Sequence, residues 1–389
     1  MKNVCVVTGS RAEYGLLRWL IAGLHDSKNI ELQLVVTGMH LSREFGETWR
    51  EIERDGYKID WQVDMLLGSD SNVAITKSIG LGMAGFADAF RHLGPDLVVI
   101  LGDRFEMLSA ATAAMIAGCP IAHLHGGELT EGLYDDPIRH AITKMSHLHF
   151  TSAEPYRNRV IQMGEHPDRV WCVGGFGLDG VAKLERMSRS DLEASLGLSL
   201  GEVSLLVTFH PETATGVNPR AQMIELLAAI EMVPAQVIFT MPNADTDGRG
   251  LFEMILEFVS THPERACVHT SLGQRRYLSL LAEVDVVVGN SSSGLIEAPA
   301  FGKGTVNIGA RQDGRLRAPS VLDCRAERSA ISRAINKALS SSFRESIQQQ
   351  SNPYGSGGAS VATLAVIEEW LARQSNRRVI KTFHDLHRN

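Results

Sequence analysis

In the first half of the chain, short apolar runs alternate with segments whose apolar residues recur at helical spacing. Runs bounded by turn residues predict buried strands, and their alternation with helices predicts a parallel sheet covered by crossover helices. The predicted strands are Val4–Thr8, Glu31–Val36, Leu97–Leu101, Pro120–Leu124 and Leu148–Ser152, with helices from about Glu13, from about Ser42 and over Phe105–Ala117. We therefore expect a first Rossmann-like domain over residues 1–175.

The same alternation starts again near Glu202. It predicts strands Ser204–Thr208, Gln236–Thr240, Ala266–Thr270, Asp285–Gly289 and Thr305–Ile308, and helices Arg220–Met232, Gly250–Thr261, Gln274–Ala282 and Ser293–Phe301. Residues 176–359 are expected to form a second doubly wound α/β domain. An amphipathic helix within 360–380 is expected to complete the first domain. The cleft between two such domains is the expected ligand site.

Length and composition agree with two globular domains. The chain has 389 residues, of which 44% are hydrophobic and 21% charged, and a single core rarely grows to that size. The net charge of −7 and the sequence pI of about 6.1 argue against a nucleic-acid-binding surface, which needs a basic stripe. Any phosphate handled by this protein is therefore expected to be small and locally bound.

The cysteines and the hydropathy of the sequence indicate in which cellular compartment the protein is expected. The five cysteines are odd in number, widely spaced and mostly within apolar runs, which predicts buried thiols in a reducing compartment. The N-terminal apolar run ends in a Gly-Ser-Arg turn and is expected to be a first strand instead of a signal peptide. No 18 consecutive residues are apolar, so no membrane insertion is expected. We expect a cytoplasmic protein.

The first strand-to-helix turn, Thr8–Gly15, offers backbone N–H groups to an anion, with Arg11 beside them. It lacks the G-x-G-x-x-G pattern of dinucleotide binding. An ordinary tight turn explains the motif equally well.

A more specific motif follows the strand that ends at Gly289. Three consecutive serines, among them Ser291 and Ser292, stand at a predicted helix start, with Glu297 one turn later. Hydroxyl and amide donors at a helix start could hold a pyrophosphate, and a carboxylate could accept ribose hydroxyls. Helix capping alone would explain one serine, so the motif favours phosphate binding.

Polar residues also follow other strands, where ligands gather in open α/β sheets. Asp103 and Arg104 come directly after Leu97–Leu101, and His210 follows the first strand of the second half. Asp103 and Arg104 could instead cap the following helix. A cleft-facing His210 could bind phosphate or substrate.

The richest stretch reads AHLHGGE, with His123, His125 and Glu128, and continues to Asp135, Asp136, Arg139 and His140. Two histidines two positions apart on an extended segment would point to one face. Histidine and carboxylate clusters suit zinc or manganese, and they suit proton transfer equally well. His147 and His149 have apolar neighbours, so we expect them to be structural.

Taken together, these residues resemble the UDP-N-acetylglucosamine 2-epimerase family, specifically its hydrolysing, UDP-releasing branch in sialic and legionaminic acid biosynthesis. The resemblance covers nearly the whole chain through ordered motifs, namely GSRAEYG, ILGDRFEML, HLHGGELTEGLYDD, FHPET, MPNADTDG, GNSSSGLIEAPAFGKGTVNIGARQ and NPYG. It implies the GT-B type fold of two Rossmann-like domains.

The resemblance also implies roles for individual residues. The UDP-binding set would be Arg11, Arg104, His210, Asn243, Ser291, Ser292, Glu297 and Arg311, and the catalytic set Asp103, His125, Glu128 and Asp135, with His210. The bifunctional animal relatives carry a glutamate at the position of His125, and this chain has an extra residue before Asp135. The division between acid and base therefore stays open.

The implied reaction removes the C2 proton of a UDP-sugar while UDP leaves from C1, and water then adds to the resulting glycal. It moves protons and no hydride, so no cofactor and no metal are expected. The alternatives are a non-hydrolysing 2-epimerase, a GT-B glycosyltransferase and a nucleotide-sugar sensor. A homo-oligomer, dimer or tetramer, is expected, without nucleic acid or membrane partners.

Overall fold

The computed structural model describes residues 1–69, 71–131, 134–212, 217–241, 248–348, 350–374 and 379–386. It divides into two compact units. Unit 1 comprises Met1–Glu128, Asp135–Asp179 and Gly357–Asn389, and unit 2 comprises Leu129–Tyr134 and Gly180–Ser356. Apart from Leu129–Tyr134, which belongs to unit 2, the chain passes into unit 2 at Gly180, where 176 was expected, and returns to unit 1 at Gly357.

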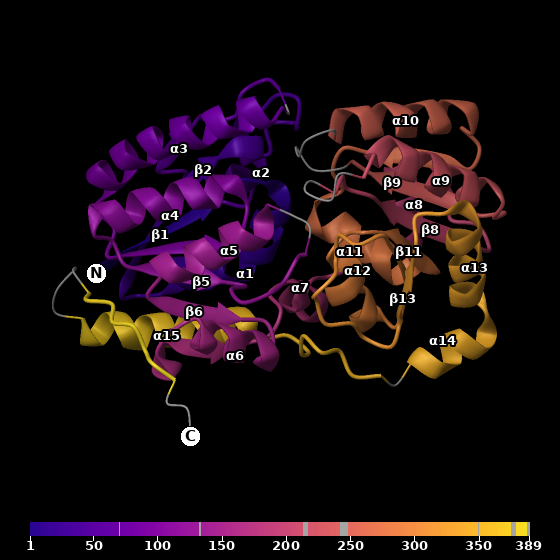
Figure 1. The fold of residues 1–389 in the computed structure, drawn as a ribbon. Helices are drawn as coiled ribbons and strands as arrows, with labels where there is room; N and C mark the ends of the chain where they lie inside the picture. The colour runs from indigo at the N-terminus through magenta and orange to yellow at the C-terminus, as the bar shows by residue number, and fades with distance from the viewer. Residues whose placement is uncertain are drawn as a thin grey trace. The chain divides into compact units, whose positions relative to one another are not determined.

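Unit 1 is built on a seven-stranded parallel sheet in the order β3-β2-β1-β4-β5-β6-β7 (Figure 1). Its strands are β1 Lys2–Thr8, β2 Ile30–Thr37, β3 Trp61–Val63, β4 Leu97–Leu101, β5 Ile121–Leu124, β6 Leu148–Thr151 and β7 Val170–Cys172. Its helices are α1 Arg11–Asp26, α2 Trp49–Arg54, α3 Asn72–Leu93, α4 Phe105–Ala117, α5 Asp135–Met145, α6 Glu154–Gln162 and α15 Ala359–Arg373, with 3-10 turns at Gly38–Leu41 and Pro167–Arg169. Helix α7, Gly177–Lys183, carries the chain into unit 2.

Unit 2 repeats the plan with a six-stranded parallel sheet in the order β10-β9-β8-β11-β12-β13. Its strands are β8 Ser204–Thr208, β9 Gln236–Thr240, β10 Ala266–His269, β11 Val286–Gly289, β12 Gly304–Ile308 and β13 Val321–Cys324. Its helices are α8 Arg189–Leu196, α9 Pro219–Glu231, α10 Gly248–Thr261, α11 Gly273–Glu283, α12 Ser293–Ile296, α13 Arg328–Leu339 and α14 Ser341–Ile347, with a 3-10 turn at Ala298–Phe301.

Each sheet is buried on both faces. In unit 1, alternate residues of β1 and β4 pack against α1 and α15 on one face and against α3 and α4 on the other. In unit 2, α9, α10 and α13 cover one face, and α8 and α11 cover the other. Strands buried on both faces read as continuous apolar runs, which is why Leu97–Leu101 was recognisable in the sequence. Two doubly wound Rossmann-like units confirm the predicted α/β fold class.

Two helix predictions need correction. The helix expected from about Ser42 is absent, because Gly46 and Glu47 both adopt positive φ, and helix α2 begins only at Trp49. The helix expected over Ser293–Phe301 ends at Ile296 and gives way to a 3-10 turn that contains Pro299, since proline lacks the N–H that would continue an α-helix.

The longest described helix, α3, and the short edge strands β3, β7 and β13 were not predicted from the sequence. Helix α3 has the length and mean hydropathy of a membrane span, although it packs on α4 with side chains such as Phe86 buried. All five cysteines are free, but only Cys5 is fully buried and Cys172 is exposed. The expectation of buried thiols is therefore wrong for Cys172.

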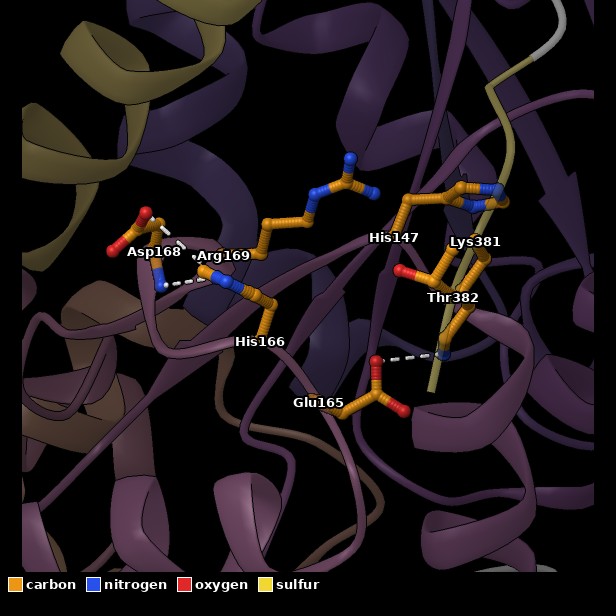
Figure 2. A pocket seen from close by; sticks show the side chains of 7 residues that line it. All are labelled: His147, Glu165, His166, Asp168, Arg169, Lys381 and Thr382. Atoms are coloured by element: carbon orange, nitrogen blue, oxygen red, sulfur yellow. Dashed lines mark hydrogen bonds and ion pairs between the residues drawn. The ribbon is translucent and has the colours of Figure 1, made fainter. Parts of the chain in front are cut away.

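A C-terminal segment, residues 379–386, packs on unit 1 beyond the last helix. The Lys381 ammonium donates to the carbonyls of Thr143, Lys144 and Ser146 at the end of α5, at 2.6–3.2 Å. Together with His147, Glu165 and Arg169 it lines a pocket of about 230 Å³, which Figure 2 shows with the Glu165–Lys381 ion pair. The segment thus fixes the C-terminal end of helix α5.

Glu165 is the anionic centre of this region. Its carboxylate accepts from His149 at 2.9 Å, from Lys144 at 2.6 Å and from Lys381 at 2.8 Å. Burial alone would raise the pKa of Glu165, but these three partners lower it to about 2. His149 is fully buried, which agrees with the structural role predicted for it.

Replacing Glu165 should make the protein less stable at neutral pH. Because the carboxyl pKa is lower in the folded chain, its stabilisation is complete above about pH 4.5 and is lost as the pH falls toward 2. We expect Glu165→Gln to lower the free energy of unfolding by about 2 kcal/mol at pH 7 and by somewhat less than half of that at pH 3. Urea unfolding at both pH values measures this, with the exposed Glu154→Gln as control. An equal loss at both pH values would contradict the ion-pair explanation.

Candidate functional site

The strand orders place one topological switch point in each unit. In unit 1 the order reverses between β1 and β4, and in unit 2 between β8 and β11. Ligands in open α/β sheets bind outside the carboxyl ends of strands at such points. The loops that follow these four strands contain Asp103, Arg104, His210 and Ser291, and Arg11 is the first residue of the helix that follows β1. The fold therefore brings the predicted residues to the two expected positions.

Asn290 organises the switch point of unit 2. Gly289 has φ +133°, and a Cβ there would lie 1.9 Å from the carbonyl oxygen of Thr208, so only glycine fits. This close approach lets the Asn290 side chain accept from His210 N at 2.7 Å and donate to His210 O at 2.8 Å. The backbone of His210 is thereby fixed at the sheet edge.

Arg311 belongs to the same network. Its guanidinium donates to the carbonyl oxygen of Asn290 at 3.1 Å, and the side-chain amide of Gln312 donates to the same oxygen at 2.7 Å. Glu297 is buried, and Ser291 accepts from Ser293 N at 3.4 Å. The predicted residues of unit 2 thus gather around one loop.

The serine motif differs from its predicted form. Helix α12 has only four residues, the side chain of Ser292 makes no capping hydrogen bond, and the Ser293 hydroxyl accepts from Tyr277 at 2.6 Å. A single turn has little helix dipole, so any anion held here would depend on individual donors. Asn243 lies outside the described residues.

In unit 1 a buried arginine connects the candidate acid–base residues. Arg139 of helix α5 is 1% exposed and forms an ion pair with Asp103, at the end of β4. Its guanidinium also donates to the carbonyl oxygen of Glu128 at 2.9 Å and lies 3.7 Å from Asp136. A buried guanidinium needs such partners. Arg139 therefore fixes Asp103 relative to the loop that ends at Glu128.

His125 and Glu128 lie on that loop. Strand β5 ends at Leu124, and His125 has φ +62°, an uncommon conformation for a residue other than glycine. Its Nδ1 lies 3.7 Å from Oε1 of Glu128, which also accepts from the Ser152 hydroxyl at 2.7 Å. Both side chains are almost fully buried. An imidazole and a carboxyl group at this separation suit proton transfer once substrate is bound.

His123 does not share the environment of His125, which corrects the expectation that both face one way. His123 is fully buried within β5 and contacts Gly102 O at 2.7 Å and the Thr143 hydroxyl at 3.1 Å. Burial lowers the pKa of His123 to about 3, so it is neutral at physiological pH. The two side chains do not share a face because strand β5 ends at Leu124, between His123 and His125. His123 has a structural role.

The two arginines of unit 1 that are predicted to bind UDP already have carboxylate neighbours. Arg11 lies 2.5 Å from Glu51 of helix α2, and Arg104 lies 3.2 Å from Glu106 of helix α4. These partners orient the guanidinium groups, because a carboxylate and a guanidinium fix each other's geometry.

Asp135, the remaining predicted catalytic residue of unit 1, is the first residue of helix α5.

Several residues that support the site had no role predicted from the sequence. Arg139 stands four positions after Asp135, on the same side of helix α5, and this spacing is the signal that could have identified it. Ser152, Asn290 and Gln312 act through contacts between distant segments, for which the sequence offers no signal. Within the described ranges, no three histidine, cysteine, aspartate or glutamate side chains are grouped to hold a metal ion.

Comparison with known proteins agrees with this geometry. The family model of UDP-N-acetylglucosamine 2-epimerase matches residues 22–368. GDP/UDP-N,N'-diacetylbacillosamine 2-epimerase (hydrolyzing) of Campylobacter jejuni is 39% identical, over 88% of this chain and 89% of that protein. Polysialic acid biosynthesis protein P7 of Escherichia coli is 38% identical, over 99% and 98%. The solved S. aureus MnaA-UDP co-structure superposes with a TM-score of 0.80 at 17% identity, covering 99% of this chain and 100% of that one.

Two Rossmann-like units place the chain in the GT-B structural class, and its sequence relatives show that it is an enzyme acting on a UDP-sugar. The chain belongs to the UDP-N-acetylglucosamine 2-epimerase family. Its sequence relatives place it in the hydrolysing branch, which confirms the resemblance read from the motifs.

Proposed function

We propose that this enzyme converts a UDP-linked 2-acetamido sugar into UDP and the free sugar with inverted configuration at C2. The observation that carries the proposal is the buried Arg139, which joins Asp103 at the end of β4 to the loop of His125 and Glu128. Ionisable groups fixed in this way at a switch point are suited to move a proton on a bound sugar.

The reaction proceeds in two stages. A base removes the C2 proton, the C1–O bond to UDP breaks with its electron pair leaving on UDP, and a 1,2-unsaturated glycal remains. Water then supplies the C1 hydroxyl, and an acid returns a proton to C2 on the opposite face. The C2 hydrogen is weakly acidic, so stabilising the departing diphosphate is the larger demand.

The leaving group and the proton need different residues. Arg11, Arg104 and Arg311 would stabilise the diphosphate, together with the donors of Ser291 and Ser292. Asp103, His125, Glu128 and Asp135 would divide the base and acid roles, with His210 as a further donor. Glu297 would contact the ribose, and Asn243 would belong to the UDP-binding set that the resemblance implies. Each of these groups would act through its position next to the diphosphate or next to C2 of the sugar. The reaction involves no hydride transfer.

A product analysis tests the proposal. Purified protein is incubated with UDP-N-acetylglucosamine and, separately, with UDP-2,4-diacetamido-2,4,6-trideoxyglucose, and the products are followed by NMR. We expect UDP together with a free, 2-epimerised sugar, with deuterium at C2 when the solvent is D2O. Product that still carries UDP would show a non-hydrolysing epimerase, and UDP release that requires an acceptor would show a glycosyltransferase. Binding without turnover would show a sensor.

The names of the relatives bear on the substrate. Two related proteins are named for diacetylbacillosamine, from C. jejuni and from Legionella pneumophila, and a third is named for polysialic acid biosynthesis. We infer a role in supplying a mannosamine-type precursor for sialic or legionaminic acid. The larger kcat/KM of the two assays identifies the C4 substituent. We further propose that the enzyme works in the cytoplasm and that it forms a homo-oligomer. Light scattering tests the oligomeric state.

A further inference from the structure

Glu13 lies in the first strand-to-helix turn of unit 1. Its side chain is 7% exposed, and its carboxyl group accepts from the backbone N–H of Gly9 at 2.6 Å. Its own N–H donates to the Ser10 hydroxyl at 3.3 Å. The carboxyl group thus lies beneath the turn that carries Arg11.

A second carboxyl side chain packs against the same glycine. Glu106 of helix α4 is fully buried, and a Cβ built on Gly9 would lie 3.3 Å from Oε2 of Glu13 and 3.4 Å from Cβ of Glu106. The carboxylate of Glu106 receives two donors from Arg104, at 3.2 and 3.3 Å. One carboxyl group therefore holds the Gly9–Arg11 turn, and its neighbour holds Arg104.

We propose that Glu13 is held in its neutral form beside the Arg104-paired Glu106, and that this pair positions Arg104 and the Arg11 turn to bind the substrate's diphosphate. Both glutamates are positioning residues, since they act through the arginines and the backbone. The proposal rests on the proposed function for the identity of the anion. The protonation state of Glu13 is independent of it.

The charges around Glu13 explain why it keeps a proton. Burial and the negative charge of Glu106 raise the pKa of Glu13 to about 7, against the opposing effects of Arg104 and of the hydrogen bonds from Gly9 and Ser10. The backbone N–H of His40, in the neighbouring 3-10 turn, donates to Gly9 O at 3.3 Å. The His40 imidazole is neutral, because burial lowers its pKa to about 3. Arg104 is the cation whose charge opposes the rise in the pKa of Glu13.

Ionisation of Glu13 would change the anion site. Two adjacent carboxylates would compete for the Arg104 guanidinium and repel an incoming diphosphate. Binding of the anion should therefore weaken as the pH rises through 7. The alternative is a purely local role, because Ser10 and Glu13, three positions apart at the start of α1, match a helix capping box. A capping box alone gives no such pH dependence.

An infrared measurement tests the protonation state without any substrate. The difference spectrum between wild type and Glu13→Gln at pH 6 should contain the C=O stretch of a protonated carboxylic acid, and this band should disappear by pH 8.5. Absence of the band at pH 6 would overturn the proposal. Glutamine is isosteric and can still accept from Gly9, and circular dichroism verifies that the variant is folded.

UDP titration tests the positioning role. The measured quantity is the Kd of wild type for UDP divided by the Kd of Glu13→Gln. Titration of UDP itself affects both values equally and cancels. We expect this ratio to rise about tenfold between pH 6 and pH 8.5. The exposed Glu53→Gln serves as background and should give a constant ratio. A constant ratio for Glu13→Gln would overturn the positioning role. If wild type bound no UDP, the proposed function would fail, while the infrared band would still decide the state of Glu13.

Discussion

Replacing Asp103 by asparagine should lower kcat/KM by a factor of about 10²–10⁴ and leave the affinity for UDP nearly unchanged. Asp103 is the carboxylate that pairs with the buried Arg139, at the end of β4. The amide keeps the shape of the side chain but removes the negative charge and the ability to accept a proton. Steady-state kinetics with either UDP-sugar, together with UDP titration, measures both quantities.

Asp136 provides the matched control. Its carboxylate also neighbours Arg139, but at 3.7 Å and with its side chain 25% exposed, so Asp136→Asn should reduce activity less than about tenfold. A purely structural role of Asp103 would appear as a lower Tm with activity recovered on cooling. Equal activity losses in both variants would contradict the special role of Asp103.

Replacing Asp179 by alanine should lower the free energy of unfolding by about 3 kcal/mol. Asp179 is fully buried and accepts three backbone N–H groups at the start of helix α15, from Gly358 at 2.5 Å, Ala359 at 3.0 Å and Ser360 at 2.7 Å. Gly358 has no side chain with which to cap this helix. Alanine would leave three buried donors without an acceptor, and urea unfolding measures the loss.

The asparagine variant separates charge from hydrogen bonding. Asp179→Asn keeps one acceptor oxygen and loses the charge, so we expect about half the loss of the alanine variant. Asp168→Ala serves as the control, because Asp168 is exposed and lies in a short 3-10 turn instead of at the start of an α-helix. This variant should change the free energy of unfolding by less than about 0.5 kcal/mol. A loss for Asp179→Ala within that range would show that α15 does not depend on this cap.

The apolar pattern of the sequence predicted the central strands well. Strands such as Leu97–Leu101 and Ser204–Thr208 occur with the predicted bounds, because strands buried on both faces must be apolar throughout. The edge strand β3, Trp61–Val63, is only three residues long, and so short an element has no detectable period. Helix α3 was missed although its cap Ser71 and its C-terminal Gly94 are ordinary boundary signals.

The sequence also determined which residues reach the switch points. Parallel strands end at one edge of a sheet, so Asp103 and His210 had to follow their strands at that edge. The ordered motifs, in turn, identified the family that the comparisons confirm. Pattern and order along the chain were sufficient for both conclusions, since neither depends on which side chains touch.

Only the tertiary structure decided which charges meet. The pairing of Arg139 with Asp103 and the capping of α15 by Asp179 join segments that are distant in sequence. The separation of His123 from His125 required a backbone turn with positive φ. Periodicity reports burial of a face, whereas hydrogen bonds and pKa shifts depend on distances of a few ångströms between elements. These distances are set by packing, and no local pattern in the chain encodes them.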